Sequence, residues 1–250
     1  MNRGAAELSG WLDPVVFARR RLGFIADDVQ ARVLRCEGKR VLLNCARQWG
    51  KSTVAALRAL HWAWTHPEGL VVAASPSGRQ SGELVRKVEG FIKRMGERVR
   101  GDGDNDISVL LPNGARIVGL PGNDDTIRGF SGAGLVLIDE AARAKEELYE
   151  AVGPMVAVSG GALWMMSTPA GRRGFFWREW TGCENWERIA VKAEECGRYP
   201  AGFLERERRR MTERSYRQEY GCEFAEVEGA FLEESVLEEA VRDDLGVLVK

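Results

Sequence analysis

Short apolar runs alternate with amphipathic stretches along most of this chain, and that alternation narrows the folds open to it. The runs lie at 39–46, 70–75, 134–142, 162–171 and 186–193. Their length and their content of β-branched and large apolar residues are typical of strands buried on both faces of a sheet. Strands that alternate with helices predict an α/β fold in which a mostly parallel central β-sheet is flanked by helices.

Helix and turn signals fill the intervals between these runs. We expect helices over 13–22, 26–37, 51–65, 78–95 and 144–152. The pair Asn113-Gly114, favoured at tight hairpin turns, predicts an antiparallel strand pair within 107–120. The charged stretch 200–221 predicts two short helices divided near Thr212.

These changes of pattern divide the chain into unequal parts. We expect a lead-in over 1–22 and a large core over 23–198. A small helical lid that includes a final core strand is expected over 199–232, and an acidic tail over 233–250. A chain of 250 residues is long enough for one large domain with a substantial core.

Charge and cysteine usage exclude some classes of protein. The net charge of −1 gives no support to nucleic-acid binding, although a local basic patch can suffice. No apolar run approaches membrane-spanning length and the N-terminus lacks a signal-peptide core, so we expect an intracellular protein without a membrane partner. The five cysteines lack C-x-x-C spacing, which predicts free thiols and neither zinc nor disulfides.

The segment CARQWGKS at 45–52 carries most of the chemistry. Gly50, Lys51 and Ser52 match the second half of the phosphate-binding pattern G-x-x-x-x-G-K-[ST], while Cys45 replaces its first glycine. In such a loop, backbone N–H groups face the phosphates, the lysine contacts the β- and γ-phosphates, and the hydroxyl ligates Mg²⁺. We therefore expect ATP and Mg²⁺ here; a chance G-K-S at a strand–helix turn is the alternative.

Other residues of the loop are candidates for nucleotide contact. They are Arg47, Gln48, Trp49 and Thr53. We expect Arg47 to lie beside the γ-phosphate, where it would stabilise developing charge in catalysis. The alternative is that Arg47 and Gln48 are solvated loop residues.

Two acids end the apolar run LVLIDE. Charged side chains rarely end a buried strand without a reason. Asp139 is expected to hold the Mg²⁺ shell, and Glu140 to position and activate the attacking water as catalytic base. The alternative is a surface turn that happens to carry two acids.

Three further features narrow the class. Phe24 and Gln30 fit the aromatic-plus-glutamine arrangement with which helicase-like ATPases hold adenine, since an amide can donate and accept at once; a surface glutamine is the alternative. Ser167-Thr168 end the fourth apolar run, where such ATPases carry a motif that couples the nucleotide site to moving parts. The run TIRGFSGAG at 126–134, with Arg128, precedes the strand of the two acids.

In combination, these motifs resemble the motor domain of the large subunit of tailed-bacteriophage terminases. The matching segments are ARQWGKS, the element around Arg128, LVLIDEAA, STPAG with the aromatics after it, and QEYGCEFAEVEGAF at 218–231. The resemblance covers about 20–232 and implies a helicase- and terminase-like P-loop NTPase fold with a small helical lid. It implies an ATP-hydrolysing motor that drives double-stranded DNA into a capsid.

The resemblance also implies partners and residue roles. The expected partners are double-stranded DNA, the viral portal and the small terminase subunit, with the motor assembled as a homo-oligomeric ring, usually described as a pentamer, in the cytoplasm of the infected bacterial host. Arg128 resembles an arginine finger that reaches a neighbouring subunit's ATP; an ordinary loop arginine is the alternative. Ser167 and Thr168 look like coupling residues, and Arg47 is similar to the loop arginine of that family.

The chain departs from that family after the motor domain. Full large subunits continue into a nuclease domain built on clustered carboxylates. Here the acids of the tail lie at helical spacing and suit a solvated helix face: Glu233, Glu234, Glu238, Glu239, Asp243 and Asp244. We therefore expect that the chain does not cut DNA. It is expected to be either an isolated motor domain or a naturally short protein.

The densest basic cluster lies in the predicted lid. Its members are Arg206, Arg208, Arg209, Arg210, Arg214 and Arg217. The cluster suits either contact with DNA phosphates or a lid surface paired with the interleaved glutamates, and we favour the second interpretation. Two other functions stay open: a helicase-like nucleic-acid-dependent ATPase, and a nucleotide-binding structural subunit with little hydrolysis of its own.

Overall fold

A single sheet organises the protein. The computed structural model describes residues 11–122 and 129–226. In these ranges seven strands pair in the order β3-β4-β2-β5-β6-β1-β7. The strands are β1 (Arg40–Cys45), β2 (Leu70–Ser75), β3 (Ser108–Leu110), β4 (Arg116–Pro121), β5 (Leu135–Asp139), β6 (Ala162–Ser167) and β7 (Glu187–Val191). Among these strands only β3 and β4 pair antiparallel, which confirms the predicted fold and hairpin.

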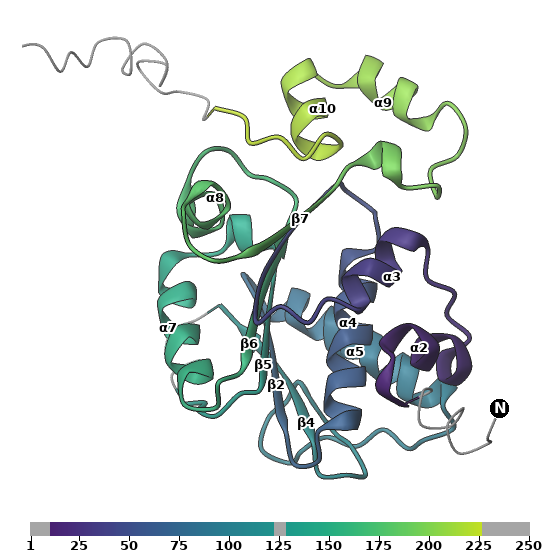
Figure 1. Cartoon of the computed structure of the whole chain (residues 1–250), viewed down its shortest axis with the longest axis vertical. Coiled ribbons are helices and arrows are strands. Elements are labelled where there is room, and N and C mark those ends of the chain that lie inside the picture. Colours follow the sequence, from purple (N-terminus) through teal and green to yellow (C-terminus); the bar gives the residue numbers. More distant parts are fainter. Residues whose placement is uncertain (1–10, 123–128, 227–250) are drawn as a thin grey trace, which may run out of the picture.

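Helices cover both faces of the sheet (Figure 1). One face carries α2 (Pro14–Leu22), α3 (Asp28–Leu34), α4 (Lys51–Thr65) and α5 (Gly78–Arg94). The other face carries α7 (Glu146–Ala157) and α8 (Gly174–Thr181). The lid helices α9 (Phe203–Arg210) and α10 (Glu213–Glu219) lie beyond one end of the sheet, and short 3-10 turns form η1 (Ala141–Arg143) and η2 (Ala193–Glu195). No helix in the described ranges has the length and apolarity that crossing a membrane requires.

Alternation along each strand divides the core in two. Val41 and Leu43 of β1 pack with α2, α3, α4 and α5, whereas Leu42 between them packs with α7 and α8. Successive side chains of a strand point to opposite faces, so an uninterrupted apolar run serves both layers. The buried runs therefore place the sheet at the centre.

Local signals set where several helices begin. The Asp13 side chain accepts hydrogen bonds from Val15 N and Val16 N ahead of Pro14, the N-cap arrangement that favours this helix start. Helix α10 begins where the sequence predicted a division, because Thr212 accepts from Ser215 N. The predicted bounds of α4 and β2 agree with the structure.

Helices α3, α7 and α8 differ from the sequence-based expectation. Helix α7 covers Glu146–Ala157 where 144–152 was expected. Helix α3 covers only Asp28–Leu34 of the predicted 26–37, because its capping box starts at Asp27. Helix α8 was not predicted at all. Its aromatic residues Phe175 and Phe176 are buried against the sheet, and a run of adjacent aromatics does not distinguish a short helix from a loop.

The lid rests on the loop after β1. Tyr220 and Cys222 form a small buried cluster with Ala46 and Ala193, against which lid side chains pack. A final core strand was expected within 199–232; residues 227–232 lie outside the described residues, and the described part of that range, 199–226, contains none. There the chain is held by a side chain instead, since Asn44 Nδ2 donates to the carbonyl oxygen of Cys222 at 2.8 Å. The boundary between core and lid stays a proposal.

Candidate nucleotide-binding site

The carboxyl ends of three adjacent parallel strands bring the candidate residues together. Strand β6 lies between β1 and β5, with Ser167 opposite Asn44 and Met166 opposite Asp139. The loop after β1, the turn after β5 and the motif after β6 therefore emerge at the same edge of the sheet. In open α/β sheets, ligands bind at this edge.

Lys51 is the centre of the site. Its Nζ donates to Oδ1 of Asp139 and, at 2.7 Å, to Oε1 of Glu140. The Ser52 hydroxyl donates to Oδ2 of Asp139 at 2.9 Å. Burial opposes a charge on Lys51, but the two carboxylates outweigh it and raise the pKa of its ammonium group, which stays charged. The structure thus brings together the four residues predicted to bind phosphate and Mg²⁺ and to activate water.

The two acids have different surroundings. Asp139 is 5% exposed and accepts a hydrogen bond from Glu140 N at 2.9 Å, in addition to Lys51 and Ser52. Glu140 has φ 55° and ψ 39°, the left-handed region that non-glycine residues seldom adopt. This conformation turns its side chain out of the strand direction at the end of β5. Backbone strain of this kind concentrates at functional sites.

The donor set suits Mg²⁺. A hydroxyl and a carboxylate are the hard oxygen ligands that Mg²⁺ prefers, and Mg²⁺ usually takes only one or two protein ligands besides water and phosphate. Ser52 Oγ and Asp139 Oδ2 lie in hydrogen-bond contact at 2.9 Å, so both can face one ion. These residues would hold the ion.

The loop before Lys51 is held by its own buried tryptophan. Trp49 is 1% exposed and packs in the core under α3 and α4. Gly50 has φ 99°, a conformation that favours glycine, and a Cβ there would lie 2.6 Å from Arg198 Nη1. Trp49 therefore anchors the loop in the core, while the absence of a Cβ at Gly50 leaves room for the side chains of Arg198 and Gln30.

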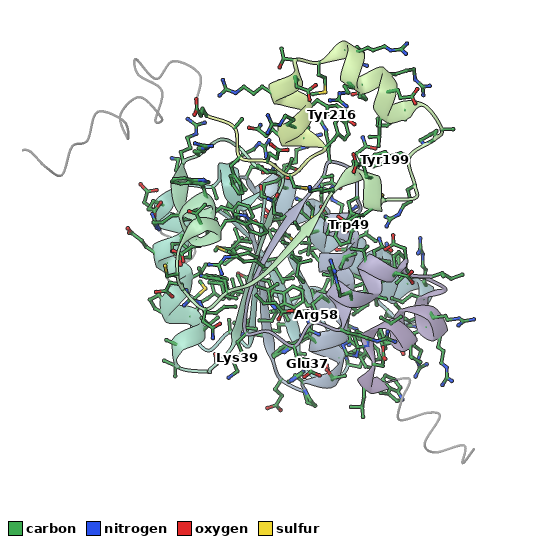
Figure 2. The ribbon with its side chains drawn as sticks, turned by 45° about the horizontal axis from the view of Figure 1, so that its top comes forward. Glu37, Lys39, Trp49, Arg58, Tyr199 and Tyr216 are labelled. Atoms are coloured by element: carbon green, nitrogen blue, oxygen red, sulfur yellow. The ribbon has the colours of Figure 1, made fainter. Side chains whose placement is uncertain are left out.

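A segment beyond β7 is hydrogen-bonded to the same loop. Arg198 Nη1 donates to the carbonyl oxygen of Trp49 at 2.6 Å, and Arg198 also pairs with Asp27. The Tyr199 hydroxyl donates to the carbonyl oxygen of Arg47. Figure 2 shows Tyr199 between Trp49 and the lid's Tyr216. Sequence reasoning missed Arg198 and Tyr199, which carry no motif and lie far along the chain from the loop.

Of the remaining candidates, Arg47 and Gln48 are exposed, whereas Thr53 is half-buried in the first turn of α4. Arg47 is largely exposed, with Nη1 3.7 Å from Oε2 of Glu219, and its N–H donates to the carbonyl oxygen of Glu219 at 2.9 Å. Gln48 is exposed with φ 60°. Thr53 Oγ1 accepts from Lys87 Nζ at 3.5 Å. Contact of these residues with a nucleotide stays a prediction.

Gln30 is buried, which excludes the surface-glutamine alternative. It is 2% exposed, and its Oε1 accepts from Asp27 N at 3.3 Å within the capping box of α3. Its Nε2 has no hydrogen-bond partner among the described residues and would lie 3.3 Å from a Cβ at Gly50. A buried amide donor without a partner beside the phosphate-binding loop is suited to a ligand acceptor. Phe24, half-buried, packs against the core nearby.

The predicted coupling residues lie beside the acids. Ser167 and Thr168 are buried, and the Thr168 carbonyl oxygen accepts from Arg143 Nη1 at 3.2 Å. Arg143 also contacts Glu140, and sequence reasoning missed it. Its position three residues after the second acid was the available signal. Arg128, the predicted arginine finger, lies outside the described residues.

Three arginines of the lid's basic cluster pair with lid glutamates. Arg208 lies 2.9 Å from Glu213, Arg210 3.4 Å from Glu207, and Arg217 pairs with Glu223. These contacts fit the interpretation that the cluster is a charge-balanced lid surface.

Comparisons with known proteins agree with this geometry. A family model of the N-terminal part of terminase large subunits of the T4-like-virus type matches residues 42–238. No curated protein matches the chain by sequence.

Solved structures share the fold. The ATPase domain of the large terminase of Thermus phage P74-26, in a mutant form, superposes with a TM-score of 0.74 at 20% identity, over 86% of this chain and 100% of that chain. The large terminase of another thermophilic bacteriophage, in complex with ADP, gives 0.67 at 18% identity, over 80% and 54%. The HK97 bacteriophage large terminase gives 0.63 at 15% identity, over 92% and 51%.

The coverage of the solved structures and the match to the family model both indicate which part of a large terminase this chain corresponds to. The chain spans the whole of the Thermus phage domain and about half the length of the other two large terminases. The family match covers most of the chain. The chain therefore belongs to the terminase large-subunit family and carries its N-terminal ATPase domain, which has a P-loop NTPase fold.

Proposed function

We propose that this chain is an ATP-hydrolysing motor that translocates double-stranded viral DNA into a capsid. The observation that carries the proposal is the convergence of Lys51, Ser52, Asp139 and Glu140 in one hydrogen-bonded cluster. A cation, a hydroxyl and two carboxylates at the carboxyl edge of a parallel sheet can bind a metal–phosphate group and activate water against it. Chance would not place four such groups in contact from two distant segments.

Each residue has a separate role in the proposed reaction. Lys51 exchanges its carboxylate partners for β- and γ-phosphate oxygens of ATP. Ser52 and Asp139 would hold Mg²⁺, which would neutralise negative charge on the phosphates. Release of Lys51 frees Oε1 of Glu140, which then accepts a proton from the water that attacks the γ-phosphorus. The bond between that phosphorus and the β–γ bridging oxygen breaks, and ADP leaves. Gln30 would donate its unpartnered Nε2–H to the adenine ring.

Assembly and partners form the second part of the proposal. Membership of the terminase family supports double-stranded DNA, a portal and a small terminase subunit as partners, in the cytoplasm of an infected bacterial host. We infer a homo-oligomeric ring, of five subunits by resemblance, in which Arg128 reaches the ATP of a neighbour. The ADP in the large terminase of the second thermophilic bacteriophage supports ATP and its product as ligands of this fold.

Steady-state ATP hydrolysis tests the proposal. The intact chain, Glu140→Gln and Glu83→Gln would be assayed across a series of protein concentrations, with and without double-stranded DNA. Glu83 is an exposed carboxylate on α5 that pairs only with Arg86 in the described structure, and it serves as the matched control. We expect Glu140→Gln to lower the rate by about 10²–10⁴-fold and Glu83→Gln to leave it unchanged.

The concentration series separates the remaining alternatives. A rate per subunit that rises with concentration, and rises further with double-stranded DNA, supports a ring motor with an arginine in trans. A flat rate counts against trans activation. ATP binding without hydrolysis in any condition leaves the nucleotide-binding structural subunit. A parallel series with single-stranded DNA tests the helicase-like ATPase, which stimulation by single strands alone would favour.

A further inference from the structure

Arg143 contacts three parts of the site at once. Its Nη1 lies 3.1 Å from Oε2 of Glu140 and 3.2 Å from the carbonyl oxygen of Thr168. Its Nη2 lies 3.6 Å from Oε1 of Glu219. These partners belong to the turn after β5, the turn after β6 and the end of α10. One guanidinium group thus links the turns after β5 and β6 to the lid.

The two oxygens of Glu140 have different partners. Oε1 accepts from Lys51 at 2.7 Å, and Oε2 accepts from Arg143 at 3.1 Å. When Lys51 turns to phosphate, Oε1 is released while Oε2 remains held. A guanidinium group is planar and directs its N–H donors in fixed directions, so it orients a carboxylate better than a point charge does. Arg143 therefore holds the Glu140 carboxylate in one orientation, with Oε1 free to accept a proton.

Glu219 is the point at which the lid meets the site. Its side chain is only 16% exposed, and its carboxylate lies between Arg143 and Arg47, at 3.6 Å and 3.7 Å. Its carbonyl oxygen also accepts from Arg47 N at 2.9 Å. The next residue, Tyr220, is buried under the lid. A displacement of α10 would therefore move the acid that Arg143 contacts.

We propose that Arg143 is a positioning residue that orients the Glu140 carboxylate and couples this orientation to lid helix α10 through Glu219. The inference rests on the proposed ATPase function for its kinetic consequence. The simpler alternative is an i,i+3 surface ion pair with Glu140, which contributes little. That alternative explains neither the contact with Thr168 nor the contact with Glu219.

Kinetics of four variants test the orienting role. Arg143→Ala keeps Lys51 and Ser52, so we expect kcat to fall about 10- to 100-fold while KM for ATP changes less than about threefold. Arg143→Lys keeps the charge without the planar fork and should recover part of kcat. Glu219→Gln should lower kcat less than Arg143→Ala does. Arg178→Ala, which removes an exposed interhelical pair with Glu146, is the control and should retain kcat.

Hydrogen exchange tests the link to the lid without any turnover. Amide exchange of residues 213–220 would be measured in protein free of nucleotide. We expect Arg143→Ala and Glu219→Gln each to increase it about three- to fivefold, and the double variant to add nothing further, because both remove the same contact. Arg178→Ala should leave exchange in this segment unchanged.

The two measurements separate failure of this inference from failure of the proposed function. Wild-type kcat in Arg143→Ala, or an unchanged exchange of residues 213–220, would overturn the positioning role even if the wild type hydrolyses ATP. A lowered kcat that Arg143→Lys restores in part, together with faster exchange, supports it. If the wild type hydrolyses no ATP, the proposed function fails, and the exchange data alone decide whether Arg143 holds lid helix α10 through Glu219.

Discussion

Lys51 Nζ lies 2.7 Å from Oε1 of Glu140, so the proposed phosphate-binding cation and the proposed catalytic base are bonded to each other. Asp139 completes the cluster as a second, more deeply buried carboxylate. A buried cation between two carboxylates is both a binding group and a structural requirement, because removing it leaves charges uncompensated. Function and stability at this edge of the sheet are therefore linked.

Replacing Lys51 should affect both properties. Lys51→Met should abolish ATP hydrolysis and, by exposing Asp139 and Glu140 to mutual repulsion, lower the free energy of unfolding by about 3 kcal/mol. Adding Asp139→Asn should restore part of the stability but none of the activity. Urea unfolding monitored by tryptophan fluorescence measures the first effect. Equal stability of wild type and Lys51→Met would show that the ion pairs contribute nothing.

Gly50→Ala should remove nucleotide binding with the fold intact. At φ 99°, alanine is strained, and its Cβ would displace the Arg198 guanidinium that lies 2.6 Å away. Gly90→Ala, in the interior of α5 with no described atom within 4 Å of the added Cβ, is the control and should stabilise the protein by about 0.5–1 kcal/mol. Titration with a fluorescent ATP analogue checks the prediction. Undiminished binding by Gly50→Ala would contradict the loop geometry.

Gln30→Glu should reduce discrimination between nucleobases. The substitution keeps the oxygen that accepts from Asp27 N and replaces the Nε2 donor, which has no partner among the described residues. The carboxylate's charge opposes both nucleotides alike, so the loss of one hydrogen bond to adenine should appear as about a fivefold larger loss of affinity for ATP than for GTP. Competition binding with both nucleotides measures the ratio. If ATP and GTP weaken equally, Gln30 acts through α3 and does not read the base.

Asn44→Ala should loosen the segment that follows the lid. Asn44 is fully buried and donates to the Cys222 carbonyl oxygen at 2.8 Å. Its removal leaves that acceptor without this donor at a cost of about 1–3 kcal/mol. Chemical unfolding should show this loss, and proteolysis should cut more readily near 222–226. A variant as stable as the wild type, with the same cleavage pattern, would show that this bond does not hold the segment.

Buried thiols predict how stability depends on pH. All five cysteines are free, and burial raises the pKa of the Cys36 thiol to about 11. A thiol with a raised pKa in the folded state keeps its proton after the unfolded chain has lost it. The free energy of unfolding should therefore fall as the pH rises from about 9, the ordinary thiol pKa, toward about 11. Urea unfolding at pH 8 and pH 10 measures the change. Cys36→Ala should show a smaller decline, and an equal decline would contradict the assignment to Cys36.

Local signals were sufficient for most of the architecture. The apolar runs predicted the parallel strands, the Asn113-Gly114 turn predicted the β3–β4 hairpin, and Thr212 marked the start of α10. Capping, turn chemistry and periodicity act between residues close in sequence, so they are visible without the fold. Helix α8 was not predicted, because its helical conformation depends on the packing of Phe175 and Phe176 against the sheet.

By itself the sequence determined the α/β class, the place of Gly50 and Lys51 at a helix start and that of Asp139 and Glu140 at a strand end. Motif spacing and apolar periodicity are local properties, so they are visible in the sequence. Only the tertiary structure decided that Arg143 and Glu219 contact each other and that Arg198 clasps the loop. Uniformly apolar strands do not specify their neighbours in a sheet, so strand order is not readable from them. That order, with β6 between β1 and β5, brings distant side chains into one site.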